Sequence, residues 1–499
     1  MSIRPTPPIE LTGTGHHFAG SPVVVPDRVV AALSEGCEVV TDPTEVAEAS
    51  RDWWPLALHW ALAGDVPQLA ACIARPRSTA EVAHVLRVCN EHVVPVTPGG
   101  GRSGVCGAAV PAFGGVVLDM TRLAGVAGVD TVSGVVEVLP GTFGPDLEDE
   151  LRSRHGLTVG HAPQSFDLAT VGGWIASRGA GQYSTRYGKI EDMVVGLEAV
   201  LADGTTVRTG GAPAAAVGPD LTQLLVGSEG TLAVITRAWL RTHPVPDHEV
   251  RAAYFFASFA DGLEACRRVL RRGATPAVLR LYDAEEAARG RGGDGTQHLL
   301  LALDEGERSL IEPGMAMLDE AARDLGATVA PIDLVADWLE HRNDTTALQA
   351  LTRRGYVVDT MEIAAPWAAL DTVFERTRAA LLEVPTAVAA TCHLSHSYLD
   401  GACLYFTFAA TPEPEHIEST YRDLWDAGQR AVLDAGGNLS HHHGIGINRH
   451  RFVRQALGSG LDVLAAIKRS LDPAGILNPG KLGLDSSFGP EPWPPGDAS

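Results

Sequence analysis

A glycine-rich stretch at residues 98–109, with the sequence PGGGRSGVCGAA, constrains the structure of this chain more than any other segment. It follows a short apolar run at residues 93–97 and leads into another at residues 115–120, and such runs are typical of buried strands. Glycine has no Cβ atom, so the loop can adopt positive φ angles and its backbone can approach a ligand closely. Successive backbone N–H groups in such a turn converge on an anion, and a diphosphate fits there.

The spacing of these glycines excludes two common phosphate sites. No Gly-Lys-Ser/Thr sequence follows, as in a P-loop, and the stretch leads into a strand, whereas a dinucleotide fingerprint opens a helix. The alternative without a ligand is a glycine-rich hairpin. Two further segments favour a ligand, because residues 161–181 combine glycine with hydroxyl side chains and residues 225–236 lead into a β-branched run. Three such segments beside predicted strands indicate one long ligand held mainly by backbone atoms.

Together the three segments resemble the PCMH-type FAD-binding domain of the vanillyl-alcohol oxidase family of flavoproteins. The resemblance covers roughly residues 68–247 and resumes near the C-terminus. It implies FAD as the cofactor, held without a covalent bond, because Arg102 occupies the position where covalently linked relatives carry a histidine. The candidate cofactor-binding residues are Pro98, Gly99, Gly100, Gly101, Arg102, Ser103, Gly104, Gly107, Ala108, Pro163, Ser165, Thr170, Gly172, Gly173, Ser177, Gly179, Gly181, Glu229, Gly230, Val234 and Ile235.

The predicted fold class is α+β. Strands and helices alternate beyond residue 248 in a pattern that predicts an antiparallel sheet with helices on one face. Proline and glycine pairs predict that a helix over residues 461–471 ends at its last residue. The expected parts are an N-terminal extension (1–67), a two-subdomain FAD-binding domain (68–247), an α+β cap that binds the substrate (248–430) and a return segment that completes the active site (431–499).

The composition is that of a globular enzyme, with 45% apolar and 20% charged residues among 499. A net charge of −22 disfavours nucleic acid and anionic membranes as partners. The seven cysteines are an odd number without framework spacing, which indicates reduced thiols and a reducing compartment. We therefore expect a cytoplasmic homodimer that acts on a small-molecule substrate, binds no nucleic acid and makes at most peripheral membrane contact.

Three adjacent histidines stand between glycine-rich turns in residues 436–446 (GGNLSHHHGIG). On an extended segment, His441 and His443 would share one face and His442 would take the other. Imidazoles beside a flavin can bind a substrate and move protons near pH 7. The alternative of a metal site would need another ligand, which residues 392–396 (CHLSH) could supply. A solvated polar turn is the remaining alternative, and we predict a proton-transfer site without a metal.

With this segment the resemblance narrows to the alkylglycerone-phosphate synthase branch of the family, which makes ether lipids. The matching segments are residues 170–174 (TVGGW), 187–192 (YGKIED), 226–232 (VGSEGTL), 402–406 (ACLYF) and 439–444 (LSHHHG). The resemblance implies a transferase-type reaction at the flavin N5, with Tyr405 and the three histidines as catalytic residues. A lowered phenol pKa would let Tyr405 move a proton. From the strand pattern alone, Tyr405 is equally a core aromatic residue.

One departure from the branch concerns arginine. The family places a catalytic arginine a fixed distance before a segment that reads DTME at residues 359–362 here, and counting back without gaps reaches Leu348. Leucine cannot make a bidentate contact with an anion. Arg342, Arg353 and Arg354 are the nearby arginines. Arg280 matches a family arginine, and Arg280 and Arg342 are the candidate substrate contacts.

A second class of enzyme shares the expected fold, namely the FAD-dependent dehydrogenases or oxidases of 2-hydroxy acids such as D-lactate or glycolate. Those relatives place a metal-binding histidine at the strand position of His393. Their Glu-His-Gly signature reads His-His-Gly at residues 442–444 here. An imidazole in place of a carboxylate weakens the binding of a hard cation. A flavin-free scaffold is the non-enzyme alternative, and the three glycine segments disfavour it.

Overall fold

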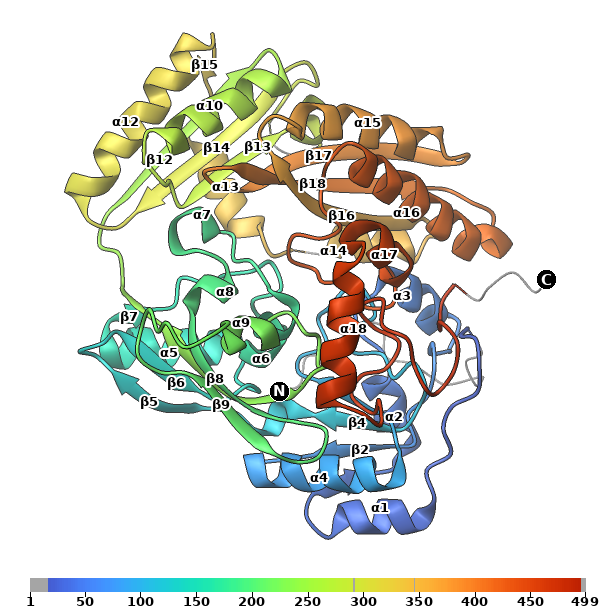
Figure 1. Ribbon diagram of the computed structural model, residues 1–499. Helices are drawn as coiled ribbons and strands as arrows, with labels where there is room; N and C mark the ends of the chain where they lie inside the picture. Colours follow the sequence, from blue (N-terminus) through green and yellow to red (C-terminus); the bar gives the residue numbers. More distant parts are fainter. Residues whose placement is uncertain (1–16, 290–291, 345, 495–499) are drawn as a thin grey trace.

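The computed structural model of the protein describes residues 17–289, 292–344 and 346–494. It has two parts, which we call the base and the cap (Figure 1). The base contains two large sheets formed before residue 245, a short two-stranded sheet of β7 (Leu157–Thr158) and β11 (His243–Pro244), and the C-terminal segment after residue 435. The cap comprises residues 249–434 and contains one large sheet. Among the described residues, no helix combines the length and the apolar character needed to span a membrane.

The first subdomain of the base has a four-stranded sheet in the order β1-β2-β4-β3. β3 and β4 are parallel neighbours, so the glycine-rich stretch between them is not a hairpin and that alternative is wrong. β1 and α1 come from the predicted N-terminal extension, which is therefore an integral part of this subdomain. The elements are α1 (Asp27–Ser34), β1 (Glu38–Val40), β2 (Cys72–Arg75), α4 (Thr79–His92), β3 (Val96–Gly99) and β4 (Val116–Asp119).

The second subdomain has a five-stranded antiparallel sheet in the order β5-β6-β10-β8-β9. The Asp203-Gly204 turn connects β8 to β9, with Gly204 at a φ of +83°. Helices α5, α6, α8 and α9 bury apolar side chains against this sheet. The elements are β5 (Val126–Asp130), β6 (Val135–Val138), α5 (Gly144–His155), α6 (Val171–Ser177), α8 (Ile190–Met193), β8 (Val194–Val200), β9 (Thr206–Gly210), α9 (Leu221–Leu225) and β10 (Val234–Arg241).

The cap is built on a seven-stranded antiparallel sheet in the order β15-β12-β14-β13-β17-β18-β16. The strands are β12 (Glu249–Phe256), β13 (Val278–Tyr282), β14 (His298–Glu305), β15 (Thr328–Val329), β16 (Val357–Pro366), β17 (Ala387–Ser397) and β18 (Gly401–Ala410). The helices are α10 (Phe259–Arg271), α12 (Arg308–Asp324), α13 (Asp333–His341), α15 (Leu370–Glu383) and α16 (Ile417–Asp434).

Helices cover both faces of the cap sheet. Side chains alternate along a strand, so Leu300 of β14 joins the core under α10, α12, α15 and α16, whereas Leu301 packs with Trp338 of α13 on the opposite face. The expectation of helices on one face is thus right for these four helices and wrong for α13 and for the short α11 (Ala284–Ala288), whose Ala287 packs in the same core as Trp338. The antiparallel sheet itself is confirmed.

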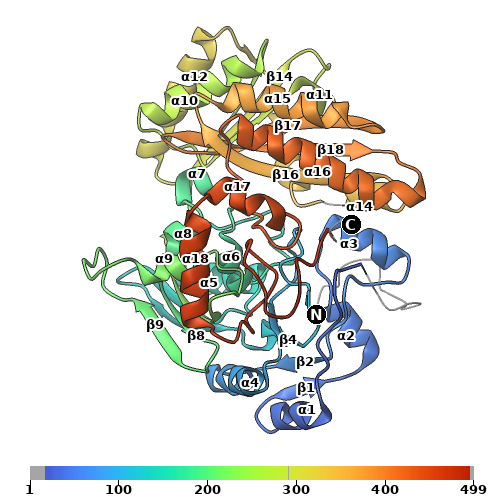
Figure 2. The same ribbon diagram turned by 45° about the vertical axis from the view of Figure 1, so that its right-hand side comes forward.

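The C-terminal segment returns to the base. Helix α18 (Gly460–Leu471) packs on the core of the second subdomain, and α17 (Val453–Leu457) lies between α18 and the cap (Figure 2). Helix α18 ends at Leu471, so the predicted end is confirmed. In the turn that follows, the Asp472 carboxylate accepts the backbone N–H groups of Ile476 and Leu477. From the N-terminal segment, α3 (Pro55–Leu62) contacts α14 (Thr346–Thr352) of the cap. Both ends of the chain therefore reach the boundary between base and cap.

Candidate functional site

A cavity of about 550 Å³ lies at the boundary between the base and the cap. All three glycine-rich segments line it from the base, and side chains of β16, β18 and α14 line it from the cap. The N-terminal segment adds Trp53, Pro55 and Leu58, and the histidine segment adds His442 and His443. Many stretches that are far apart in the sequence thus face one space.

The structure brings nearly all the predicted cofactor-binding residues together in this cavity. The exceptions are Gly107 and Gly181. A Cβ atom on Gly107 would lie 3.1 Å from the Trp54 ring, and one on Gly181 would lie 2.7 Å from the Ala162 nitrogen. These two glycines are therefore packed against protein atoms behind the cavity wall.

The glycines of the first segment serve mainly to let backbones approach each other. Within residues 98–109, positive φ angles occur at Gly107 (+77°) and, unexpectedly, at Arg102 (+52°). A Cβ atom on Gly100 would lie 2.2 Å from Thr170 Oγ1, and one on Gly101 would lie 1.8 Å from the Leu168 carbonyl oxygen. The prediction that the glycines provide positive φ angles is thus wrong for most of them, because close packing on the second segment requires them.

Glu229 ties the third glycine segment to the histidine segment. Its buried carboxylate accepts the backbone N–H groups of Ile445 at 2.5 Å and Gly446 at 2.8 Å. Burial raises the pKa of Glu229, while these donors oppose the shift. Gly444 lies so close that a Cβ atom would stand 2.4 Å from Glu229 Oε1. The carboxylate therefore holds the histidine segment against the cavity wall.

The three histidines do not alternate as an extended segment would. Their backbone N–H groups all point at Glu362 Oε1, with distances of 3.1, 3.0 and 2.8 Å for His441, His442 and His443. This turn directs His442 and His443 toward the cavity, whereas His441 lies behind it, with Nε2 2.6 Å from the Tyr398 hydroxyl. The predicted pairing of His441 with His443 is wrong because the segment is a loop and not a strand.

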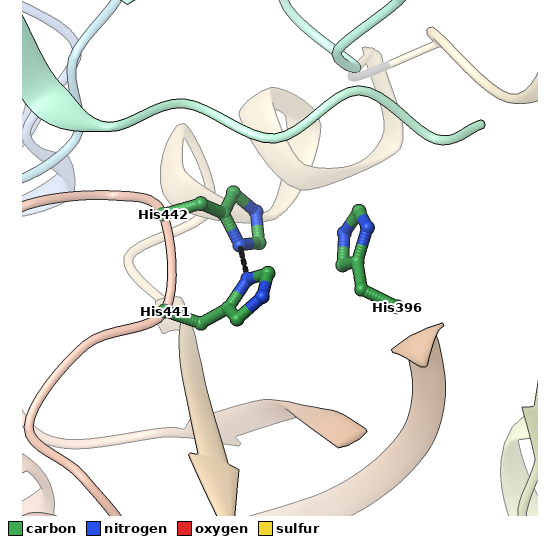
Figure 3. A group of neighbouring side chains, drawn as sticks. All are labelled: His396, His441 and His442. Atoms are coloured by element: carbon green, nitrogen blue, oxygen red, sulfur yellow. Dashed lines mark hydrogen bonds between the residues drawn. The ribbon is translucent and has the colours of Figure 1, made fainter. Parts of the chain in front are cut away.

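His396 of β17 completes a cluster with the first two histidines (Figure 3). One ring nitrogen from each of His396, His441 and His442 lies within 4.8 Å of the other two. Hydrogen-bonding partners are already present: the two Nδ1 atoms of His441 and His442 are 2.8 Å apart, and His396 Nδ1 lies 2.7 Å from the Ser184 hydroxyl. Burial holds the pKa of all three imidazoles well below the ordinary value, so they are neutral at pH 7.

Tyr405 stands in a row of side chains across adjacent cap strands. Its register partners are Glu362 on β16 and His393 on β17, and its ring stacks on the imidazole of His393 at 4.9 Å between centroids. The hydroxyl lines the cavity and donates to Thr360 Oγ1 at 3.0 Å. Burial raises the pKa of the phenol, so the condition for proton transfer by Tyr405 is not met and Tyr405 is a neutral donor.

Arg280 lies behind this row and is not one of the residues that line the cavity. Its Nη2 is 2.7 Å from His393 Nε2, and its Nε donates to the Tyr282 hydroxyl at 2.7 Å. His393 Nδ1 is in turn 2.8 Å from Glu286 Oε1. These contacts favour a supporting role, in which Arg280 holds Tyr405 in place through His393, over a direct contact with the substrate.

The region of α13 and α14 supplies the cavity with amide and hydroxyl groups. Asn343, Gln349 and Thr352 line it, whereas Arg353 and Arg354 are exposed. Arg342 lies over the Tyr183 ring at 5.1 Å and is not a lining residue. The side chain of Leu348 lies outside the described residues. Within the described part of this region, therefore, no arginine reaches the cavity.

Comparisons with known proteins place this architecture in a family. Residues 70–210 match the FAD binding domain, and residues 245–482 match the C-terminal domain of FAD linked oxidases. The FAD-linked oxidoreductase YgcU of Escherichia coli is 30% identical over 472 residues, which cover 89% of this chain and 95% of YgcU. The chain belongs to the FAD-linked oxidoreductases. FAD is its cofactor.

Two other FAD-linked oxidoreductases show the range of activities among the relatives. A structure of alkyldihydroxyacetonephosphate synthase superimposes with a TM-score of 0.77 at 25% identity, covering 93% of this chain and 87% of that one. The glycolate oxidase subunit GlcD of Bacillus subtilis is 26% identical over 82% of this chain and 88% of GlcD. The predicted FAD-binding fold with its cap is confirmed, and the family contains both classes of enzyme considered from the sequence.

The cavity of this FAD-linked oxidoreductase fits the diphosphate of FAD. Arg102 is largely buried, and its Nε and Nη1 atoms have no hydrogen-bond partner. The closest carboxylate oxygen recorded for it, Asp119 Oδ1, is 4.0 Å away. An anion in the cavity would provide the missing acceptors, and buried cations need such partners. The three glycine segments with Arg102 are therefore the residues that would hold FAD.

Sequence reasoning missed three contributors to the site. In the sequence, Glu362 was noted only as the last residue of the segment that locates the family's arginine position. His396 was noted only as a ligand for the alternative of a metal site. Trp53 was placed in an extension that packs on the body, whereas it lines the cavity. Their positions depend on contacts between distant segments, which residue spacing does not reveal.

Proposed function

We propose that this enzyme oxidises a hydroxyl group of a small molecule, such as a 2-hydroxy acid, and that His443 accepts the hydroxyl proton. The observation that carries the proposal is the place of His442 and His443 in the cavity that the glycine segments line. A substrate there faces both the cofactor site and a base. FAD, when bound, supplies the acceptor for the two electrons that leave with the substrate hydride.

The other lining residues suit this reaction. The neutral phenol of Tyr405 orients the substrate oxygen as a hydrogen-bond donor, while its hydroxyl stays within reach of Thr360. Trp53, Pro55 and Leu58 form an apolar wall that excludes water from the reacting atoms. An imidazole is a suitable base because its ordinary pKa lies near the working pH. The reaction needs no arginine from the α13–α14 region.

The second candidate is the synthesis of an ether bond, as the resemblance to alkylglycerone-phosphate synthase implies. Tyr405 and the histidines favour it, as does the likeness to the synthase structure. In that reaction a long-chain alcohol displaces an acyl group from a phosphate ester. The family's reaction relies on a catalytic arginine, and the described residues of α13 and α14 bring none into the cavity. We therefore place this candidate second.

The test mixes the flavoprotein anaerobically with a panel of 2-hydroxy acids and, separately, with acyl-dihydroxyacetone phosphate. Bleaching of the visible flavin absorbance by a hydroxy acid, with formation of the oxo acid, is the expected result. An ether product from the phosphate ester and a fatty alcohol, without bleaching by any hydroxy acid, would establish the second candidate and overturn the first.

A further inference from the structure

Glu362 on β16 is the centre of the hydrogen bonding beneath the histidine segment. Its side chain is completely buried. Besides the three histidine N–H groups, Oε1 accepts the Ser440 hydroxyl at 2.7 Å. Arg449 Nη1 is a fifth donor to the same oxygen at 3.4 Å. The four donors from residues 440–443 hold that stretch as a single turn. A carboxylate accepts such bonds strongly because it is charged.

The second carboxylate oxygen faces two cationic or polar partners. Oε2 lies 3.0 Å from His443 Nδ1, although the ring is not oriented for a hydrogen bond there, and Oε2 also pairs with Arg449 Nη2. Arg449 is itself completely buried and donates to the Leu439 carbonyl at 2.8 Å. Burial favours the protonated acid, but Arg449 and then His443 outweigh it and hold the pKa of Glu362 well below the ordinary value. Glu362 is therefore an anion that only accepts hydrogen bonds.

This arrangement determines which nitrogen of His443 carries the proton. The negative charge of Glu362 favours the imidazole tautomer whose nearer nitrogen carries the proton, because a lone pair on that nitrogen would face the anion at 3.0 Å. Nδ1 of His443 is that nitrogen, and in a neutral imidazole the lone pair is then on Nε2. A base whose orientation and tautomer are set by a carboxylate is the arrangement found in catalytic triads.

We propose that Glu362 is a positioning residue that holds His443 as the Nδ1–H tautomer and keeps Nε2 ready to accept the substrate proton. The catalytic role of this tautomer rests on the proposed function, because Nε2 takes part in the reaction only if His443 is the base. The tautomer itself is independent of the substrate.

The first test uses Glu362→Gln. The glutamine oxygen can still accept the backbone N–H groups, but its amide donates where Oε2 accepted, which favours the opposite tautomer. We expect the rate of flavin reduction to fall by about 10²–10⁴-fold, with KM changed by less than about threefold. Ser440→Ala is the matched control, because it removes one donor to the same oxygen without touching an imidazole. It should stay within about threefold of wild type. Equal losses in the two variants would overturn the proposal.

A double-mutant cycle separates positioning from a general structural role. If Glu362 acts through His443, then adding Glu362→Gln to His443→Gln causes no further loss of rate. Multiplicative losses, each variant retaining its bound flavin, would overturn the proposal.

A measurement on the wild-type holoenzyme covers the case in which Glu362→Gln does not fold. Histidine-selective ¹⁵N labelling, with His443→Gln to assign the signal, reports the tautomer directly. A protonated Nδ1 and an unprotonated Nε2 are expected, and the opposite tautomer would contradict the inference. If the tautomer is as expected but no hydroxy acid reduces the flavin, the proposed function alone fails.

Discussion

The Tyr421 hydroxyl donates a hydrogen bond of 2.6 Å to Asp359 Oδ2, a carboxylate that lines the cavity. The same hydroxyl accepts the indole N–H of Trp54 at 2.9 Å. All three side chains are buried, and Asp359 also accepts the Trp425 indole N–H at 2.9 Å. One phenol thus connects the N-terminal segment to the cap.

Replacement of Tyr421 by Phe should destabilise the protein. The change leaves the Trp54 N–H without its acceptor and removes a donor from Asp359, and each buried group left unsatisfied costs about 1–3 kcal/mol. We expect a loss of about 2–4 kcal/mol in denaturant unfolding. Tyr254→Phe is the control, because its hydroxyl reaches only Asp319 at 3.2 Å, and its loss should be under about 1 kcal/mol. Similar losses of unfolding free energy in the two variants would show that the hydrogen bonds of Tyr421 to Trp54 and Asp359 contribute no extra stability.

Arg102 should contribute to FAD affinity through charge and not through a covalent bond. Acid precipitation should release the flavin into the supernatant, and a yellow pellet would contradict this. In titrations of apoprotein with FAD, Arg102→Met should weaken binding by about 10–100-fold, since hydrogen bonds to charged groups contribute about 1.5–3 kcal/mol. Arg102→Lys keeps a positive charge but loses the two parallel N–H donors of the guanidinium, so its FAD affinity should lie between those of wild type and Arg102→Met.

Tyr405 should matter less than His443 for proton removal. Because burial raises the pKa of its phenol, Tyr405 keeps its proton, and Tyr405→Phe should slow flavin reduction by less than about tenfold. His443→Gln should slow it by at least about 100-fold. Stopped-flow reduction under anaerobic conditions measures both. A larger loss for Tyr405→Phe than for His443→Gln would assign the base to the phenol.

His161 should make the protein less stable in mild acid. Burial lowers the pKa of its imidazole from 6.5 to about 3, and neither ring nitrogen has a hydrogen-bond partner. Below pH 6.5 the unfolded chain binds a proton that the folded protein refuses, so stability falls as the pH falls toward 3. The slope is about 1.4 kcal/mol per pH unit.

His161→Phe, which preserves a ring against Trp174, should remove this part of the slope in unfolding experiments between pH 6 and 4. His161→Gln should remove it as well, although its stability at pH 7 will differ. An unchanged slope in both variants would exclude His161 as its source.

The cluster of His396, His441 and His442 should function without a metal ion. His441 Nε2 is engaged by Tyr398, and Nδ1 of His441 and of His442 engage each other. Dialysis against EDTA should therefore leave the flavin reduction rate and the Tm unchanged, and elemental analysis should find substoichiometric metal. One tightly bound zinc or iron per chain, with activity lost on its removal, would contradict the prediction of no metal.

Local patterns predicted the parts of this protein that local chemistry determines. The end of α18 depends on residues close in sequence and lies where expected. The three glycine segments were recognisable from their composition, although the packing that requires Gly100 and Gly101 is with residues 168–170. The cofactor also followed from them, because backbone atoms of those segments line its site.

The orientation of the histidines could not be predicted in this way. The turn at residues 440–443 depends on Glu362, which is more than 75 residues away in the chain. Without that long-range contact, an extended segment with side chains on alternate faces was the reasonable expectation. Likewise β1 belongs to a sheet whose other strands begin at Cys72, so its sequence alone suggested an extension. Long-range hydrogen bonds decided both cases.

The two buried carboxylates beneath the histidine segment also determine when the site can form during synthesis. Glu229 and Glu362 find their donors in residues 440–449, close to the end of the chain. While the ribosome still holds those residues, both carboxylates lack their partners, and buried charges without partners are costly. The nascent protein can fold its sheets but keeps this region hydrated. Stable cofactor loading therefore requires residues 440–449 to have left the ribosome, and ribosome-bound chains that end before residue 440 should carry no flavin.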